Sequence, residues 1–402
     1  MRPQDLKVFN VLFFSIFAAV TGVGIVVPLL PVYARDVGAS GFYIGMIFGI
    51  FSIARTAFIP LFGRASDRRG RKPFIVGGML GYALISLAYV AVSDFPALIA
   101  IRFFQGVASA MMMPVLQAYV GDITPEGREG FTMGYFNLAT FAGLSLGPLL
   151  GGVISDSWSI DAAFIMMGLL ALFGFLACAL LLPPTQSESA LGRGTPPIAW
   201  ACLTQDPVIR GLFTFRLAYT AGIGVIWGFL PIYADQQFKP GAAAIGLLIM
   251  AGVMTSGLFQ VPMGYLADRV NKSRMVVAGG ILAGAALLGF TWATSFTTML
   301  LGSLFFGMGG GVAMPALMGL AVKKGVAMDA MGSVMSALTL AHSLGMLTGA
   351  LLAGCAMDWL DLRWAFPVGA AIMAAGIGAF CYWVSSGAPE GRARATMPEE
   401  SD

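Results

Sequence analysis

Long apolar stretches alternate with short polar segments along almost the whole chain. At a helical rise of about 1.5 Å per residue, a stretch of about 20 residues crosses a hydrocarbon core of about 30 Å. The pattern therefore predicts membrane-spanning helices. We place twelve spans at residues 8–34, 42–63, 73–93, 96–120, 130–154, 161–182, 207–233, 243–265, 275–294, 297–321, 330–356 and 363–385.

The second half of the chain repeats landmarks of the first about 201 positions later, so that Gly106 recurs as Gly307 and Met113-Pro114 as Met314-Pro315. A polar, proline-rich segment separates the sixth span from the seventh. Many secondary transporters are built from such repeats, with the substrate site where the repeats meet. We therefore predict an all-α integral membrane protein with two pseudo-symmetric six-helix bundles, at 1–182 and 207–385, a cytoplasmic linker at 183–206 and a cytoplasmic tail at 386–402.

Composition excludes a soluble protein. Hydrophobic residues make up 58% of the chain and charged residues 11%, whereas about 25% of a soluble protein is charged. Lys and Arg concentrate on one side of the predicted bilayer, which places both termini in the cytoplasm and the chain in the cell's inner or plasma membrane. The net charge of +3 serves this topology and does not predict nucleic-acid binding. Since no phosphate-binding loop, zinc spacing or nucleophile triad is present, we expect no enzyme activity, metal or cofactor.

A charged segment between the second and third spans resembles the corresponding loop of the major facilitator superfamily. The pattern there is Gly, three residues, Asp, a basic residue, any residue, Gly and two basic residues. The matching positions are Gly63, Asp67, Arg68, Gly70, Arg71 and Lys72, and the chain departs at Ala65, where the family usually has leucine. A degraded copy follows the eighth span. This resemblance covers the whole chain and implies the twelve-helix major facilitator fold.

The resemblance implies a conformational latch in this charged segment. Asp67 would meet the start of the eleventh span near Asp329, and Arg71 would pair with Asp122, in the outward-facing state. The alternative is that the basic cluster only sets the membrane topology. The fixed glycines and aspartate favour the latch, because topology alone requires only positive charge.

The fifth span carries a second resemblance, to the antiporter motif of the superfamily. The motif reads Gly, three residues, Gly-Pro, two residues, Gly-Gly, and it is matched at Gly143, Gly147, Pro148, Gly151 and Gly152. Glycines four residues apart line one helix face and permit close helix contact, and an internal proline permits a bend. An ordinary small-residue helix contact is the alternative. Within the family the motif favours drug/proton antiporters and efflux.

Ionisable residues inside a membrane are unfavourable and are therefore functional candidates. Arg102 and Gln105 in the fourth span resemble a family pattern in which the arginine is linked to proton transfer; the alternative is that Arg102 only extends to the membrane surface. We predict Gln105 as a substrate-binding residue. Arg55, in the second span, is nearer the boundary between the halves, and we expect it to be structural.

The seventh span predicts one wall of the substrate site. Arg216 lies near the membrane midplane, and Tyr219, Thr220 and Trp227 follow on its face at helical spacing. Seventh helices border the central cavity in this family, and a structural arginine bonded to backbone carbonyls is the alternative. His342, the only histidine, lies near the centre of the eleventh span, where it is either a packing residue or a site for substrate and proton.

No Asp or Glu lies deep inside any predicted span. Antiporters of cationic drugs commonly use a buried carboxylate, so we expect a neutral or anionic amphipathic substrate here. The sequence predicts a proton-coupled exporter that works by alternating access, as a monomer in the lipid bilayer. Import or facilitated diffusion of an anionic metabolite is one alternative, and a receptor or scaffold that transports nothing is another.

Overall fold

The computed structural model describes residues 3–92, 94–125, 128–183, 205–328 and 330–386. Over these residues the secondary structure is helical and contains no strand. Twelve helices are long and apolar enough to cross a membrane, which confirms the predicted fold class. The elements are α1 (Pro3–Asp36), α2 (Gly41–Arg69), α3 (Arg71–Ala91), α4 (Phe95–Asp122), α5 (Glu129–Ser157), α6 (Ile160–Leu181), α8 (Pro207–Phe238), α9 (Ala242–Arg269), α10 (Lys272–Thr291), α11 (Phe296–Ala327), α12 (Met331–Trp359), the short η1 (Leu362–Trp364) and α13 (Ala365–Ser386).

Several helices extend beyond the apolar spans that predicted them. The segment expected as a charged loop is the last two turns of α2, one glycine and the first turn of α3. Gly70 separates the two helices and has φ of 87°, a conformation that glycine adopts without strain. The apolar span marks only the part of a helix inside lipid, so a charged helical extension is invisible to a hydropathy count.

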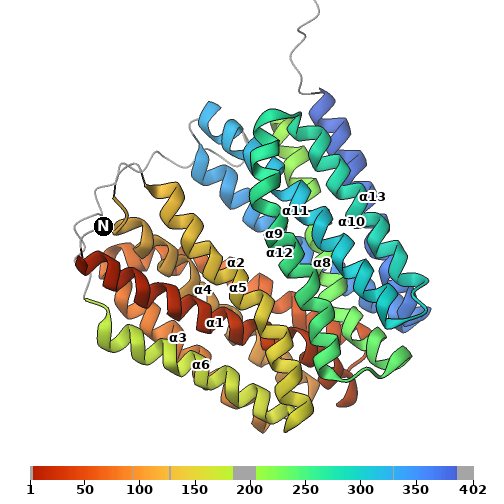
Figure 1. Cartoon of the computed structure of the whole chain (residues 1–402), viewed down its shortest axis with the longest axis horizontal. Coiled ribbons are helices and arrows are strands. Elements are labelled where there is room, and N and C mark those ends of the chain that lie inside the picture. Colours follow the sequence, from red (N-terminus) through yellow and green to blue (C-terminus); the bar gives the residue numbers. More distant parts are fainter. Residues whose placement is uncertain (1–2, 93, 126–127, 184–204, 329, 387–402) are drawn as a thin grey trace, which may run out of the picture.

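Helices α1–α6 pack into one bundle and α8–α13 into a second, coloured red to yellow-green and green to blue in Figure 1. Across the boundary, α2 packs on α12 and α5 packs on α9. A Cβ atom on Gly41 would overlap the carbonyl oxygen of Gly354, and one on Gly152 would overlap that of Ala242. Helix backbones from the two bundles therefore touch at this end of the molecule, which we call the sealed end.

The two bundles separate toward the opposite end, which we call the open end. A Cβ atom added to Gly63 on α2, Gly134 on α5 or Gly332 on α12 would meet no atom within 4 Å. Figure 1 shows the bundles diverging toward the side marked N. Three of the four helices that make the sealed contacts, α2, α5 and α12, are thus free of close neighbours at these glycines, and the arrangement resembles a V.

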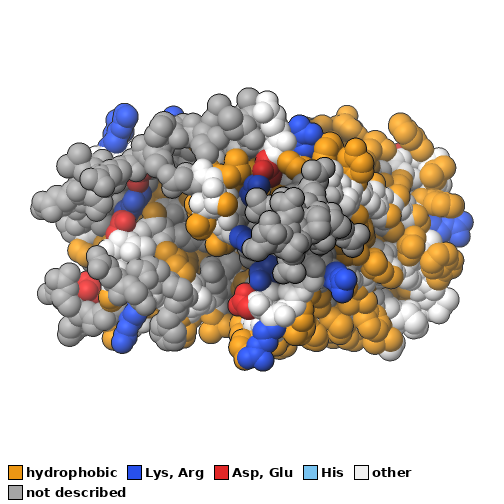
Figure 2. Space-filling model, turned by 90° about the horizontal axis from the view of Figure 1, so that it is seen from above, with side chains coloured by type: hydrophobic (Ala, Val, Ile, Leu, Met, Phe, Trp, Pro, Cys, Tyr) orange, Lys and Arg blue, Asp and Glu red, His pale blue; other side chains and the backbone are white. Residues whose placement is uncertain are grey.

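The surface along the bundles is apolar, as lipid requires. Large apolar side chains are exposed on the outer helix faces, among them Leu84, Leu180, Val261 and Ile281. Figure 2, seen from above the view of Figure 1, shows Lys and Arg scattered over that face and hydrophobic side chains along its margin. Arg68 and Arg69 in the last turn of α2 and Lys324 in the last turn of α11 place charge at helix ends. The predicted linker and tail lie largely outside the described residues.

Candidate functional site

A cavity of about 240 Å³ lies in the second bundle where it faces α5. Its wall is mostly apolar and aromatic, and α8, α9, α11 and α12 supply most of it. Phe141 and Leu144 of α5 close it from the first bundle. Ligand sites are commonly apolar cavities with a few polar groups, and a transporter built from repeats binds substrate where the repeats meet.

The cavity brings together four of the predicted binding residues: Arg216, Tyr219 and Trp227 of α8, and His342 of α12. Arg216 Nη1 donates to Met314 Sδ at 2.7 Å, and Nη2 lies 3.4 Å from His342 Nδ1. Among the described residues, the buried Nε of Arg216 has no hydrogen-bond partner. Arg216 therefore does not bind backbone carbonyls, as a purely structural arginine would. Its Nε can still donate a hydrogen bond to a ligand.

Three polar residues of the wall were missed by the sequence analysis: Ser256 and Gln260 on α9, and Ser303 on α11. Ser256 and Gln260 are four positions apart and so share one helix face, which is the signal that could have found them. Ser303 occupies the position that corresponds to Arg102 under the offset of about 201 residues. A serine there leaves space that an arginine would fill.

Electrostatically the cavity is positive. Its lining includes one arginine and one histidine but no Asp or Glu. The ring of Tyr219 stacks on Phe306 with centroids 5.4 Å apart and an interplanar angle of 7°. An aromatic wall beside an uncompensated guanidinium suits an apolar body that carries a negative or hydrogen-bond-accepting group.

Two predicted binding residues, Thr220 and Gln105, do not lie on this wall. The Thr220 hydroxyl donates to the carbonyl oxygen of Arg216 at 2.8 Å and faces α12 at Gly345. Gln105 is fully buried inside the first bundle, where its Oε1 accepts from Tyr89 Oη at 3.0 Å and from Arg102 Nη1 at 2.7 Å. Helical spacing predicted the face of each residue but not the neighbour that covers it.

Arg102 is enclosed by protein and does not extend to the membrane surface. Its Nε donates to the Ile47 carbonyl oxygen at 3.1 Å. The guanidinium lies over the rings of Phe48 and Phe51, at 5.3 and 4.5 Å from the centroids. These contacts join α4 to α2, and the hydrogen bond from Tyr89 to Gln105 joins α4 to α3. The role of Arg102 in proton transfer stays a prediction.

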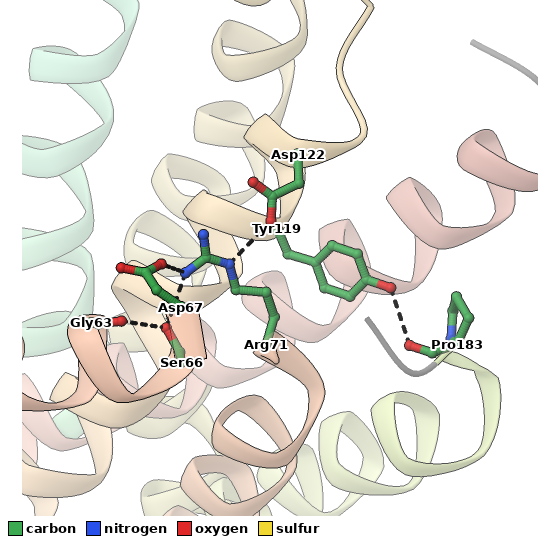
Figure 3. Close-up of polar contacts among 7 residues, drawn as sticks. All are labelled: Gly63, Ser66, Asp67, Arg71, Tyr119, Asp122 and Pro183. Atoms are coloured by element: carbon green, nitrogen blue, oxygen red, sulfur yellow. Dashed lines mark hydrogen bonds and ion pairs between the residues drawn. The ribbon is translucent and has the colours of Figure 1, made fainter. Parts of the chain in front are cut away.

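At the open end, Arg71 joins three helices of the first bundle (Figure 3). Its Nε donates to Asp122 Oδ2 at 3.0 Å, and its Nη1 donates to Ser66 Oγ at 3.0 Å and to Asp67 Oδ1. Lys72 Nζ donates to the Leu182 carbonyl oxygen at 2.6 Å, which ties α3 to the end of α6. Arg71 therefore does pair with Asp122.

The other half of the expected latch concerns Asp67 and α12. In this structure Asp67 pairs with Arg71 of its own bundle, and the bundles are apart at this end. Asp329, the expected neighbour, lies outside the described residues. Arg68 is exposed. In the degraded copy, Asp268 pairs with Lys272 at 3.5 Å, and Asn271 caps α10 in place of glycine.

The antiporter motif gives α5 two packed faces. Gly143, Gly147 and Gly151 lie against α1; a Cβ on Gly151 would come within 2.9 Å of Ile25. Gly152 and Pro148 instead face α9 of the second bundle, at Ala242 and Gly246. The predicted helix contact is therefore present on both sides, and one of its two surfaces belongs to the sealed boundary between the bundles.

Two aspartates close the sealed end by capping helices of the opposite bundle. The N–H groups of Gly41 and Phe42 donate to Asp358 at 2.6 and 2.9 Å, and those of Ala242 and Ala243 donate to Asp156 at 2.9 and 2.8 Å. The N-cap residues of α2 and α9 make no side-chain cap of their own. Arg35 and Asp235 add an ion pair of 2.9 Å between the bundles.

Two six-helix bundles of repeated design, sealed at one end and with a cavity at their boundary, are an architecture on which many secondary transporters are built. A sequence profile of the Major Facilitator Superfamily matches residues 12–233 and 212–400. The chain belongs to this superfamily and is a membrane transporter.

Its relatives include proteins named for drug resistance. The chain is 28% identical to an uncharacterized MFS-type transporter of Methanocaldococcus jannaschii, with 90% of this chain and 94% of the relative covered. It is 26% identical to Multidrug resistance protein 2 of Bacillus subtilis, with 94% and 96% covered. It is 25% identical to the quinolone resistance protein NorA of Staphylococcus aureus, with 66% and 68% covered.

Solved structures share the fold at low identity. A nucleoside transporter, NupG, aligns with a TM-score of 0.80 at 13% identity, covering 94% of this chain and 99% of NupG. A bacterial homolog of the lysosomal transporter Spinster, in an inward-facing conformation, aligns with 0.79 at 12% identity, covering 96% and 98%. The human organic anion transporter MFSD10 aligns with 0.65 at 19% identity, covering 94% and 100%. At these identities the likeness shows the fold alone.

Proposed function

We propose that the chain exports a small amphipathic molecule, neutral or anionic, in exchange for protons and by alternating access. The observation that carries this proposal is the mostly apolar cavity at the boundary between the bundles, with Arg216 on its wall and no carboxylate among the lining residues. The names of the drug-resistance relatives support efflux. The antiporter motif supports exchange, because its Gly152 and Pro148 lie in the contact with α9 that must separate when the sealed end opens.

The open end faces the cytoplasm in this proposal. Arg68, Arg71 and Lys72 lie there, and the positive-inside rule assigns such clusters to the cytoplasmic side of the inner or plasma membrane. Both termini are then cytoplasmic, and the structure is an inward-open state ready to load substrate from the cell. The cavity is enclosed within one chain, which supports a monomer as the transporting unit.

His342 and Arg102 are the proposed proton-coupling residues. Histidine is the side chain whose ordinary pKa lies near neutral pH, and His342 contacts Arg216 in the cavity. A proton on His342 adds positive charge beside Arg216, so its binding is coupled to that of the substrate. Exchange requires that the substrate disfavour the proton, as an apolar body does when it excludes water from the imidazole. Arg102 would act indirectly, through its hydrogen bond to Gln105 and that of Gln105 to Tyr89.

Proton flux in proteoliposomes tests this function. The interior carries a pH-sensitive dye, a proton gradient is imposed, and neutral and anionic aromatic amphiphiles are added one at a time. We expect some of them to increase proton flux, and His342→Gln to lose this increase. Arg269→Gln, at an exposed position on α9, is the control. Substrate movement that ignores the gradient would instead support facilitated diffusion of an anion, and no movement at all would support a receptor or scaffold.

A further inference from the structure

We propose that the substrate is an organic anion whose charged head binds between two arginines of opposite bundles, Arg216 of α8 and Arg55 of α2, with its apolar body in the cavity. The ligand class is a carboxylate or sulfonate on a small aromatic or aliphatic skeleton. The inference deepens the proposed function and rests on it for the cavity being a transport site.

The position of Arg55 follows from the crossing of α2 and α12 beside the cavity. Thr56 Oγ1 and Ser343 Oγ share a hydrogen bond across the boundary between the bundles. Arg55 precedes Thr56 and His342 precedes Ser343, so both side chains start next to this contact. His342 interacts electrostatically with Arg55 as well as with Arg216. The imidazole therefore contacts the guanidinium of Arg216 and lies within electrostatic range of that of Arg55.

Both arginines have unused hydrogen-bonding capacity. The Nε atoms of Arg55 and Arg216 are buried and have no hydrogen-bond partner among the described residues. Neither arginine takes part in the ion pairs that the described part of the chain forms. Within the first bundle, Arg55 interacts electrostatically with Tyr82, whose buried hydroxyl makes no hydrogen bond to it. A buried cation without a counter-charge is unfavourable, and an anion between the two would accept hydrogen bonds from both.

Arg55 and Arg216 do not occupy equivalent positions of the two repeats. With the offset of 201, Arg55 corresponds to Ser256 and Arg216 corresponds to Ser15. Each bundle thus contributes one arginine at a position where the other bundle has serine. Since like charges on separate bundles repel, an anion held between them converts repulsion into attraction and favours closure of the open end around the ligand.

The rest of the cavity suits an apolar skeleton. Ile226 and Trp227 of α8, Leu248 of α9 and Phe141 of α5 form its apolar wall. The volume of about 240 Å³ is below the range of about 300–1,000 Å³ typical of drug-sized ligands. A fused two-ring aromatic acid is therefore the size of ligand that we expect.

Three matched naphthalene derivatives test the proposal on the purified full chain. The probes are naphthalene-2-carboxylate, its neutral carboxamide and the cationic 2-naphthylmethylammonium, and binding is measured by calorimetry. We expect the carboxylate to bind best. Arg55→Gln and Arg216→Gln should each weaken it at least about tenfold, the value of one charge-assisted hydrogen bond, and should weaken carboxamide binding much less, because the amide carries no charge. Arg55→Lys keeps the charge and should restore part of the affinity, while Arg269→Gln should have no effect.

Carboxamide binding as tight as that of the carboxylate, or full affinity in Arg55→Gln, would overturn the two-arginine site. Carboxamide binding also serves as the folding control for each variant. Anion binding without transport would contradict the proposed function and leave the site standing. Proton-driven transport of the neutral carboxamide without carboxylate binding would contradict the two-arginine site and leave the proposed function standing, so the two failures are distinguishable.

Discussion

Removing the two aspartates that cap helices across the sealed end should open that end. Asp156 and Asp358 each accept two backbone N–H groups of the opposite bundle, at helices that have no side-chain cap of their own. These contacts are lost when the sealed end separates, so their free energy contributes to the equilibrium between the two states. Removing an N-cap carboxylate costs about 1 kcal/mol of helix stability. Because Asp156 and Asp358 are exposed and water screens their charge, we assign no more than this typical value to each.

The double variant Asp156→Ala/Asp358→Ala therefore removes about 2 kcal/mol of preference for the sealed state. Every 1.4 kcal/mol is a factor of ten, so the ratio of sealed to unsealed molecules should fall about 30-fold. Each single variant should give about a fivefold change. The two sites are on different helix pairs, so their effects should add.

Electron paramagnetic resonance distance measurements check this expectation. Ala91 and Trp292 are exposed, occupy pseudo-equivalent positions at the ends of α3 and α10, and would carry spin labels on cysteines in a background lacking the native cysteines. A longer inter-bundle distance should gain population in the double variant. Asp94→Ala is the matched control, because Asp94 caps α4 within its own bundle. If the double variant gives the same distance distribution as this control, the capping contacts do not hold the sealed end.

Three further outcomes are expected. Gly152→Val should favour the unsealed state in the same distance measurement, because its Cβ would overlap the Ala242 carbonyl oxygen; an unchanged distribution would contradict the close packing. Arg71→Gln should lower the free energy of unfolding by about 1–2 kcal/mol, measured by denaturant titration, because the ion pairs with the partly exposed Asp122 and Asp67 are lost; a change below about 0.3 kcal/mol would show that these ion pairs do not stabilise the fold. Ser303→Leu should fill the cavity and weaken naphthalene-2-carboxylate binding at least about tenfold, and unchanged affinity would place the site elsewhere.

The fold could be predicted because lipid imposes a strong rule on the sequence. Each span must be apolar for its full length, and the repeat of Gly106 at Gly307 shows the duplication directly. Arg216, Tyr219 and Trp227 could be placed on one wall because helical spacing determines which residues share a face. Gln105 could not be assigned correctly in the same way. Its place in the fourth span predicts how deep it lies in the membrane, but not that the Tyr89 hydroxyl of α3 donates a hydrogen bond to it.

The sealed end was not predictable by local patterns. Asp358 caps a helix 317 positions away in the chain, and Asp156 caps one 86 positions away. Neither aspartate stands near the N-terminus of its own helix, which is where capping signals are sought. The duplication held a usable clue, because Gly41 and Ala242 begin pseudo-equivalent helices and the two aspartates lie at pseudo-equivalent ends.

The replacement of Arg102 by Ser303 at pseudo-equivalent positions has a consequence for substitutions. In one copy of the ancestral unit the site is filled by a guanidinium bound to backbone and amide, so substitutions there disturb folding. In the other copy the same site borders open space and tolerates change. Substitutions in the second copy should therefore change ligand recognition with less effect on folding than substitutions at the equivalent position of the first copy.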